Sequence, residues 1–216
     1  MKTDLLHPFE NIPYFTMEGF KQITGMESPE QVRTLLHRWA KAHHILQLKK
    51  GVYMTRRFYD LHRVEYLFSA AVSAILIPQS YLSLEFILQQ HNLLAEATYP
   101  ITCITTKNTC RIINPIGVFW YRSIRDNLFH GFTITEYFGI RIAQATVAKA
   151  LFDYLYLRPL PVSYRNIKIN LAEELRLNLD ELSTTDRKEF SRIVEESKSR
   201  KMKEILNNFR SNIWHP

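Results

Sequence analysis

Residues 28–57 read SPEQVRTLLHRWAKAHHILQLKKGVYMTRR, and the first half of this stretch carries the signals of a well-defined helix. Ser28 can cap the helix, Pro29 suits its first position, and Gln31 stands where a capping box needs it. Apolar residues then recur with the i, i+3, i+4, i+7 spacing of one helix face, namely Val32, Leu35, Leu36 and Trp39. The pattern predicts a helix over residues 30–43 with one buried face.

The segments on both sides of this helix complete a larger pattern. Before it, Thr16 can cap a shorter helix, MEGFKQI, and a glycine-bearing turn at residues 24–27 connects the two helices. After it, residues 45–48 and 52–54 have the composition of short strands, and Lys49-Lys50-Gly51 can form the turn between them. Two helices followed by a hairpin are typical of a winged helix-turn-helix, which we assign to residues 1–57.

The charge of the chain is concentrated in the same region. The 216-residue chain has a net charge of +7, and residues 30–63 hold eight basic and two acidic residues, a local charge of +6. Residues 64–184 hold ten of each and are neutral. A localised basic patch indicates a surface that binds a polyanion, but a solvated basic surface accounts for the charge alone equally well.

The polar face of the predicted helix and the hairpin turn supply the candidate DNA-binding residues. Side chains near the start of such a helix can reach base edges in the major groove, whereas cations on a wing suit the phosphate backbone. The candidates for base contacts are Gln31, Arg33, Thr34 and Arg38. The other candidates are His37 and Lys41 on the same face, Lys49 and Lys50 on the wing, and Ser28, which mainly serves the cap. Trp39 is expected in the core.

The rest of the chain predicts a linking helix and a second domain. We expect one helix over residues 58–79, broken at Pro78, and a mixed α+β domain over residues 80–160. That domain is expected to begin with an amphipathic helix from Ser80 and to continue with strands at residues 99–106 and 110–124, joined by a Lys107-Asn108 hairpin turn. One or two further strands follow at residues 130–143, with Gly131 and Gly139 as bend points, and then a helix at residues 145–158.

Residues 161–216 form a helical C-terminal extension in this prediction, with one long polar helix from residue 184. An interrupted apolar stripe runs along that helix, which carries many basic residues. Three roles remain open: packing on the second domain, an added contact to the DNA backbone, or a dimer or partner interface.

Several classes of protein do not fit the composition. No apolar run reaches the ~18 residues of a membrane span, and the N-terminus lacks the features of a secretory signal, so we expect a cytoplasmic protein. The two cysteines, Cys103 and Cys110, form no disulfide framework or zinc-site spacing. They are expected as small buried residues, although they could face each other across a hairpin. We expect no cofactor and no metal.

An enzyme is the rival class, and a metal-dependent nuclease is its natural member for a basic chain. Such a site needs convergent acids and often a lysine, for which Glu85, Glu136, Lys149 and Asp153 are available. Lys149 and Asp153 also have the i, i+4 spacing of an ordinary helical ion pair, which is the better explanation. We therefore expect no enzymatic activity.

The order of these motifs resembles the AbiEi-type antitoxins, the DNA-binding half of abortive-infection toxin–antitoxin pairs. The resemblance covers residues 14–157 and is carried by Lys50-Gly51-Val52-Tyr53, Ser80-Tyr81-Leu82-Ser83, the stretch IGVFWYRSI and the helix from Ala145 to Asp153. Members often have Pro-Glu where this chain has Val147-Ala148, so the role of that glutamate does not carry over.

The resemblance implies a transcriptional repressor. Such proteins bind inverted repeats in their own promoter through the N-terminal winged helix and repress the operon. For this chain we expect one copy on each half-site, as a homodimer or a cooperative pair. Their C-terminal domain counteracts a nucleotidyltransferase-like toxin. The alternative reading of this chain is a DNA-binding regulator without a toxin partner.

Overall fold

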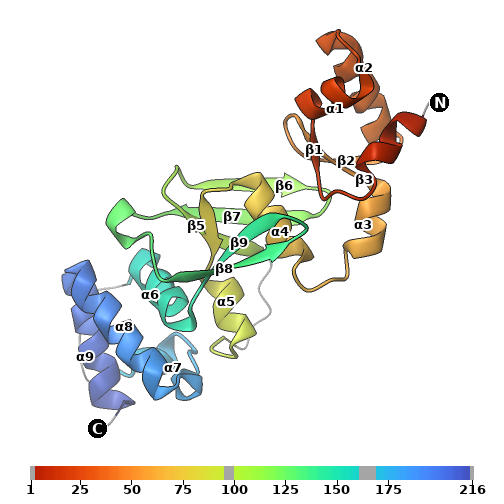
Figure 1. The fold of residues 1–216 in the computed structure, drawn as a ribbon. Helices are drawn as coiled ribbons and strands as arrows, with labels where there is room; N and C mark the ends of the chain where they lie inside the picture. The colour runs from red at the N-terminus through yellow and green to blue at the C-terminus, as the bar shows by residue number, and fades with distance from the viewer. Residues whose placement is uncertain (1–2, 95–99, 161–168, 215–216) are drawn as a thin grey trace. The chain divides into compact units, whose positions relative to one another are not determined.

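The computed structural model describes residues 3–94, 100–160 and 169–214, which form a mixed α+β structure (Figure 1). The expected α+β class is therefore confirmed. The chain divides into two compact units. The N-terminal unit comprises Met1–Pro78, Arg111–Phe119 and Glu136–Ile142, and the C-terminal unit comprises Gln79–Cys110, Trp120–Thr135 and Ala143–Pro216.

Both helices predicted near the N-terminus are present. A 3-10 helix, η1 (Asp4–Phe9), precedes α1 (Met17–Thr24) and α2 (Pro29–Lys41). Thr16 caps α1, because its Oγ1 accepts a hydrogen bond of 3.0 Å from the backbone N–H of Gly19. α1 ends at Gly25, whose φ of 70° is the left-handed conformation that glycine adopts without strain. The turn that follows leads directly to α2.

A small antiparallel sheet and an aromatic core complete this part of the N-terminal unit. Its strands are β1 (Phe15–Thr16), β2 (Ile45–Lys49) and β3 (Val52–Thr55), in the order β1-β3-β2. Gly51, at a φ of 76°, forms the turn between β2 and β3. The rings of Phe9, Phe15, Phe20, Trp39 and Tyr53 pack together behind the helices and bury the apolar face of α2.

The single linking helix expected over residues 58–79 is wrong. The segment forms α3 (Arg56–His62) and α4 (Phe68–Leu76), separated by residues 63–67. Val64, which lies in this connection, is 85% exposed. In the same connection, the Glu65 carboxylate lies 2.6 Å from His62 Nδ1 and accepts a hydrogen bond of 2.7 Å from the Tyr137 hydroxyl. These polar contacts lie in the connection between α3 and α4, a break that the apolar spacing of the segment did not predict.

A second sheet has the strand order β6-β7-β5-β4-β9-β8. Its strands are β4 (Ser80–Leu82), β5 (Ile101–Thr105), β6 (Cys110–Asn114), β7 (Gly117–Ser123), β8 (Phe132–Tyr137) and β9 (Ile140–Ala145). β4 pairs with β5 in antiparallel fashion and with β9 in parallel fashion. The strands that the sequence predicts at residues 130–143 are present as β8 and β9, joined by a turn at Phe138-Gly139 where both φ angles are positive.

This sheet corrects three predictions. Residues 80–82 form a strand rather than the start of a helix, and α5 (Glu85–Gln90) begins only afterwards. β5 and β6 are not neighbours, so no hairpin forms across Lys107-Asn108. Cys103 is buried on β5 and Cys110 is exposed on β6, so the two do not face each other and the expected burial of Cys110 is wrong.

Helices make up the rest of the C-terminal unit. They are η2 (Asp126–Leu128), α6 (Val147–Leu157), α7 (Leu171–Glu174), η4 (Leu179–Glu181), α8 (Thr184–Ser197) and α9 (Arg200–Asn212). The one long helix expected from residue 184 is instead the pair α8 and α9, because Lys198 adopts a φ of 52° and Ser199 caps the second helix. Both helices pack against α6 (Figure 1). Part of the predicted extension, residues 161–168, lies outside the described residues.

Candidate nucleic-acid interface

α2 separates its apolar and polar side chains onto two faces. Val32, Leu36 and Trp39 are completely buried, and Leu35 is partly buried. The Trp39 ring meets Phe20 edge-on, with centroids 5.6 Å apart, so the indole belongs to the core as expected. On the other face the side chains are all exposed: Gln31, Arg33, Thr34, His37, Arg38 and Lys41. The candidate residues on α2 therefore share one solvent-facing surface.

Ser28 acts as the helix cap. Its Oγ accepts a hydrogen bond of 3.4 Å from the backbone N–H of Gln31. The cap fixes where α2 begins, and Pro29 occupies the first helical position, where its missing N–H costs no hydrogen bond. The first exposed turn of α2 is thus held in a defined position by local chemistry.

The basic side chains of this surface form no ion pairs with carboxylates among the described residues. Among the described residues, no carboxylate lies within 4.0 Å of the charged groups of Arg33, Arg38, Lys41 or Lys50. Two arginines beyond the hairpin behave differently: Arg56 pairs with Asp60 at 2.8 Å, and Arg57 with Glu10 at 3.5 Å. The positive charge of α2 and of the Lys50 turn therefore remains available to a ligand.

Lys49 has a different role from the one that the sequence suggested. Its ammonium donates to the backbone carbonyls of Ile75, at 3.1 Å, and Leu76, at 2.7 Å. These carbonyls belong to the last turn of α4, where the helix leaves its C=O groups without internal partners. Lys49 therefore caps a helix in this structure, and its contact with a DNA phosphate stays a prediction. Lys50, one residue further along, is exposed.

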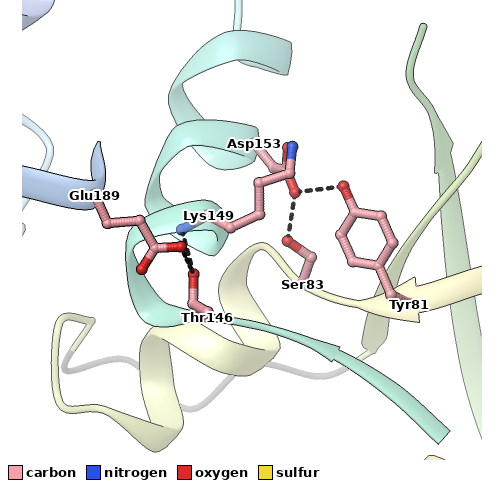
Figure 2. Close-up of polar contacts among 6 residues, drawn as sticks. All are labelled: Tyr81, Ser83, Thr146, Lys149, Asp153 and Glu189. Carbon is pink, nitrogen blue, oxygen red and sulfur yellow. Dashed lines mark hydrogen bonds and ion pairs between the residues drawn. The ribbon is translucent and has the colours of Figure 1, made fainter. Parts of the chain in front are cut away.

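A second polar cluster lies inside the C-terminal unit (Figure 2). The Lys149 Nζ donates to Asp153 Oδ1 at 2.6 Å, so the i, i+4 ion pair expected on α6 is present. The other carboxylate oxygen, Oδ2, accepts hydrogen bonds from the Tyr81 hydroxyl at 3.0 Å and the Ser83 hydroxyl at 2.8 Å. Lys149, Asp153 and Ser83 are completely inaccessible to solvent. The cluster joins α6 to the segment that begins with β4.

Burial dominates the electrostatics of this pair. It lowers the pKa of the Lys149 ammonium and raises the pKa of the Asp153 carboxyl, because both charges have left water. The opposite charge of the partner and the hydrogen bonds to Asp153 oppose these shifts. A nuclease would need this carboxylate and lysine to reach a phosphodiester. Since both are enclosed and bonded within the unit, they serve as a structural anchor.

The sequence predicted the ion pair but not its other members. Tyr81 and Ser83 were expected on a helix, where their hydroxyls would not have converged on Asp153. Gly131 adds a further constraint, since a Cβ at this position would lie 3.1 Å from Lys149 Cγ, and its φ is +77°. The signal that could have identified the cluster is the polar Lys149 and Asp153 within the otherwise apolar helix VAKALFDYLYL.

Comparisons with known proteins give no family assignment: no protein-family profile and no curated protein matches the chain significantly. Over the described parts of the chain, His, Cys, Asp and Glu side chains do not gather in groups of three or more that could hold a metal ion. Within the same ranges, every helix is too short or too polar to cross a membrane.

Proposed function

We propose that the N-terminal unit binds double-stranded DNA through the exposed face of α2. The observation that carries the proposal is the division of α2 into a buried apolar face and a solvent-facing side. The basic side chains on the solvent-facing side form no ion pair with a carboxylate among the described residues. The order of α1, a turn, α2 and the β2–β3 hairpin supports a winged helix-turn-helix, since this motif presents its second helix to the major groove.

The chemistry of the surface suggests how the contacts divide. Gln31, Arg33, Thr34 and Arg38 have side chains that can hydrogen-bond base edges, and three of them lie in the first two turns of α2. Lys41, His37 and Lys50 suit phosphate oxygens, which give affinity and salt dependence but little sequence information. Ser28 contributes by fixing the start of the helix.

The DNA that we propose as the target is the promoter of the chain's own operon. This step rests on the resemblance to AbiEi-type antitoxins, which also implies an inverted-repeat operator, a second copy on the other half-site and a nucleotidyltransferase-like toxin as the protein partner. On this proposal the protein is a cytoplasmic repressor and antitoxin rather than an enzyme.

The test is a fluorescence-anisotropy titration of the full chain with its upstream promoter duplex and with a scrambled duplex of the same composition, each at two salt concentrations. We expect tighter binding to the promoter, and weaker binding to both duplexes at the higher salt concentration. Equal affinity for the two duplexes would reject the repressor, and no binding to either would reject the DNA interface.

A further inference from the structure

A groove on the C-terminal helices gathers positive charge away from α2. It is formed by α8 and the end of α9 and has a volume of ≈ 590 Å³. Four basic residues line it, Arg187, Lys188, Arg192 and Arg210, against a single acidic residue, Glu195. This volume lies within the range of small-molecule sites, and four of the eight residues that line the groove are basic.

One wall of the groove is already fixed in position. Arg187 Nε donates to the Leu182 carbonyl at 3.1 Å, and its guanidinium lies over the Trp214 ring, 5.7 Å from the centroid. These contacts use one N–H of a group that has five. Arg187 is therefore preorganised, with further donors left for a ligand that carries several acceptor oxygens.

The remaining cations are held less tightly. Arg192 pairs with Glu196 at 3.1 Å on the exposed side of α8, and Arg210 is exposed near the end of α9. Trp214, which also lines the groove, is 8% exposed. Its indole nitrogen is buried, so Trp214 contributes ring surface to the groove rather than a hydrogen-bond donor.

We propose that this groove binds the phosphate group of a phosphorylated ligand. A phosphate offers several charged acceptor oxygens, matches the bidentate geometry of arginine, and suits a lining with a net charge of +3 (four bases and one acid). Two sources share this chemistry: a free nucleotide or similar metabolite, and the backbone of a nucleic acid. The proposal does not rest on the DNA contacts of α2, because the groove lies wholly in the C-terminal unit.

The test follows backbone and indole NMR signals of the full chain during titration with inorganic pyrophosphate, ATP, adenosine and a short DNA duplex. Adenosine controls for binding that does not involve phosphate. We expect pyrophosphate and ATP to shift the signals of residues 184–195 and the Trp214 indole, and adenosine to leave them in place. If only the duplex shifts them, the phosphate comes from a nucleic acid backbone.

Charge reversal provides the matched comparison. Arg210→Glu removes a groove cation, whereas Lys203→Glu makes the same change at an exposed position on the same helix that does not line the groove. We expect Arg210→Glu to weaken binding about tenfold or more, and Lys203→Glu to change it less than about twofold. Arg210→Gln, which adds no new charge, repeats the test if the reversal unfolds the helix pair.

Two results would overturn the proposal: no ligand shifts the groove signals, or Arg210→Glu and Lys203→Glu weaken binding equally. Neither depends on promoter binding, which is monitored separately through the signals of residues 29–41. A chain that lost promoter binding but kept its pyrophosphate site would contradict the proposed function and leave this inference standing.

Discussion

Basic side chains have opposite surroundings in the two units of this protein. On α2, Arg33, Arg38 and Lys41 are exposed and have no carboxylate partner among the described residues. On α6, Lys149 is completely buried and bonded to Asp153. α2 is amphipathic and α6 is buried along most of its length, yet both helices carry cations. The comparison shows that burial and pairing, rather than residue type, decide whether a cation can meet a ligand.

The largest expected effect comes from breaking the buried pair. Asp153→Ala would leave the Lys149 ammonium enclosed without its counter-charge, and the Tyr81 and Ser83 hydroxyls without their acceptor. We expect the free energy of unfolding to fall by about 3–5 kcal/mol. Urea denaturation of the full chain, followed by circular dichroism, measures the change.

Two further variants test whether the loss of stability comes from the buried ion pair. Arg38→Ala removes an exposed cation from α2 and is expected to change the free energy of unfolding by less than about 0.5 kcal/mol. Lys149→Met combined with Asp153→Leu removes both charges and should recover part of the loss, because no buried charge stays uncompensated. If Asp153→Ala costs no more than Arg38→Ala, the pair is not an anchor of the C-terminal unit.

The second prediction concerns the exposed residues of α2. Arg33→Ala or Thr34→Ala should weaken binding to the promoter by about 1–3 kcal/mol and reduce the preference over scrambled DNA, because a base contact is lost. Anisotropy titrations at one salt concentration measure both quantities. Arg56→Ala is the matched control, since Arg56 is already paired with Asp60 on α3. A loss of the same size in Arg56→Ala would show that the effect is one of overall charge.

The third prediction separates two adjacent lysines. Lys49→Ala removes the cap on the Ile75 and Leu76 carbonyls and should lower the free energy of unfolding by about 1–2 kcal/mol. Lys50→Ala should leave stability unchanged and instead lower the slope of log affinity against log salt by about one. Denaturation curves and salt titrations of the two variants distinguish these effects. A lower salt slope in Lys49→Ala without loss of stability would restore Lys49 to the DNA interface.

Local signals were enough to predict α2. Its cap, its first-turn proline and its apolar spacing all lie within a few residues of one another, and the structure has the helix at Pro29–Lys41 with Val32, Leu36 and Trp39 buried. The exposed candidate residues on α2 follow directly from that spacing. Where the decisive chemistry is local in sequence, periodicity and capping suffice.

Predictions failed where distant segments decide the structure. The apolar residues Tyr81, Leu84, Ile87 and Leu88 are all buried, as the face of an amphipathic helix would be. Residues 80–82 nevertheless form a strand, because β5 and β9 pair with both of its edges. Lys49 looked like a wing cation because nothing near it in sequence indicates that the end of α4 reaches its ammonium. The spacing of apolar residues indicates which side chains are buried, and the charge of a residue indicates which bonds it can form. Neither identifies a partner that is distant in sequence.

The smallest expected effect concerns an exposed carboxylate in the N-terminal unit. Hydrogen bonds from Tyr137 and then His62 lower the pKa of Glu65 below its ordinary value of 4.5. The contribution of Glu65 to stability is therefore present above pH 4.5 and is lost as the pH falls through the lowered pKa of the folded state. Glu65→Gln should lower the Tm at neutral pH by less than Lys49→Ala does, and the difference from the unmodified chain should vanish at low pH.

Thermal unfolding of both chains between pH 3 and pH 7 checks this sign, because the other carboxylates titrate equally in both and cancel in the difference. Tyr137→Phe serves as the matched variant, since it removes one donor to Glu65 and keeps the ring. It should reproduce part of the Glu65→Gln difference at neutral pH and none of it at low pH. A Tm difference that is independent of pH would show that Glu65 acts through packing, and that its charge, unlike that of Asp153, is not what the fold uses.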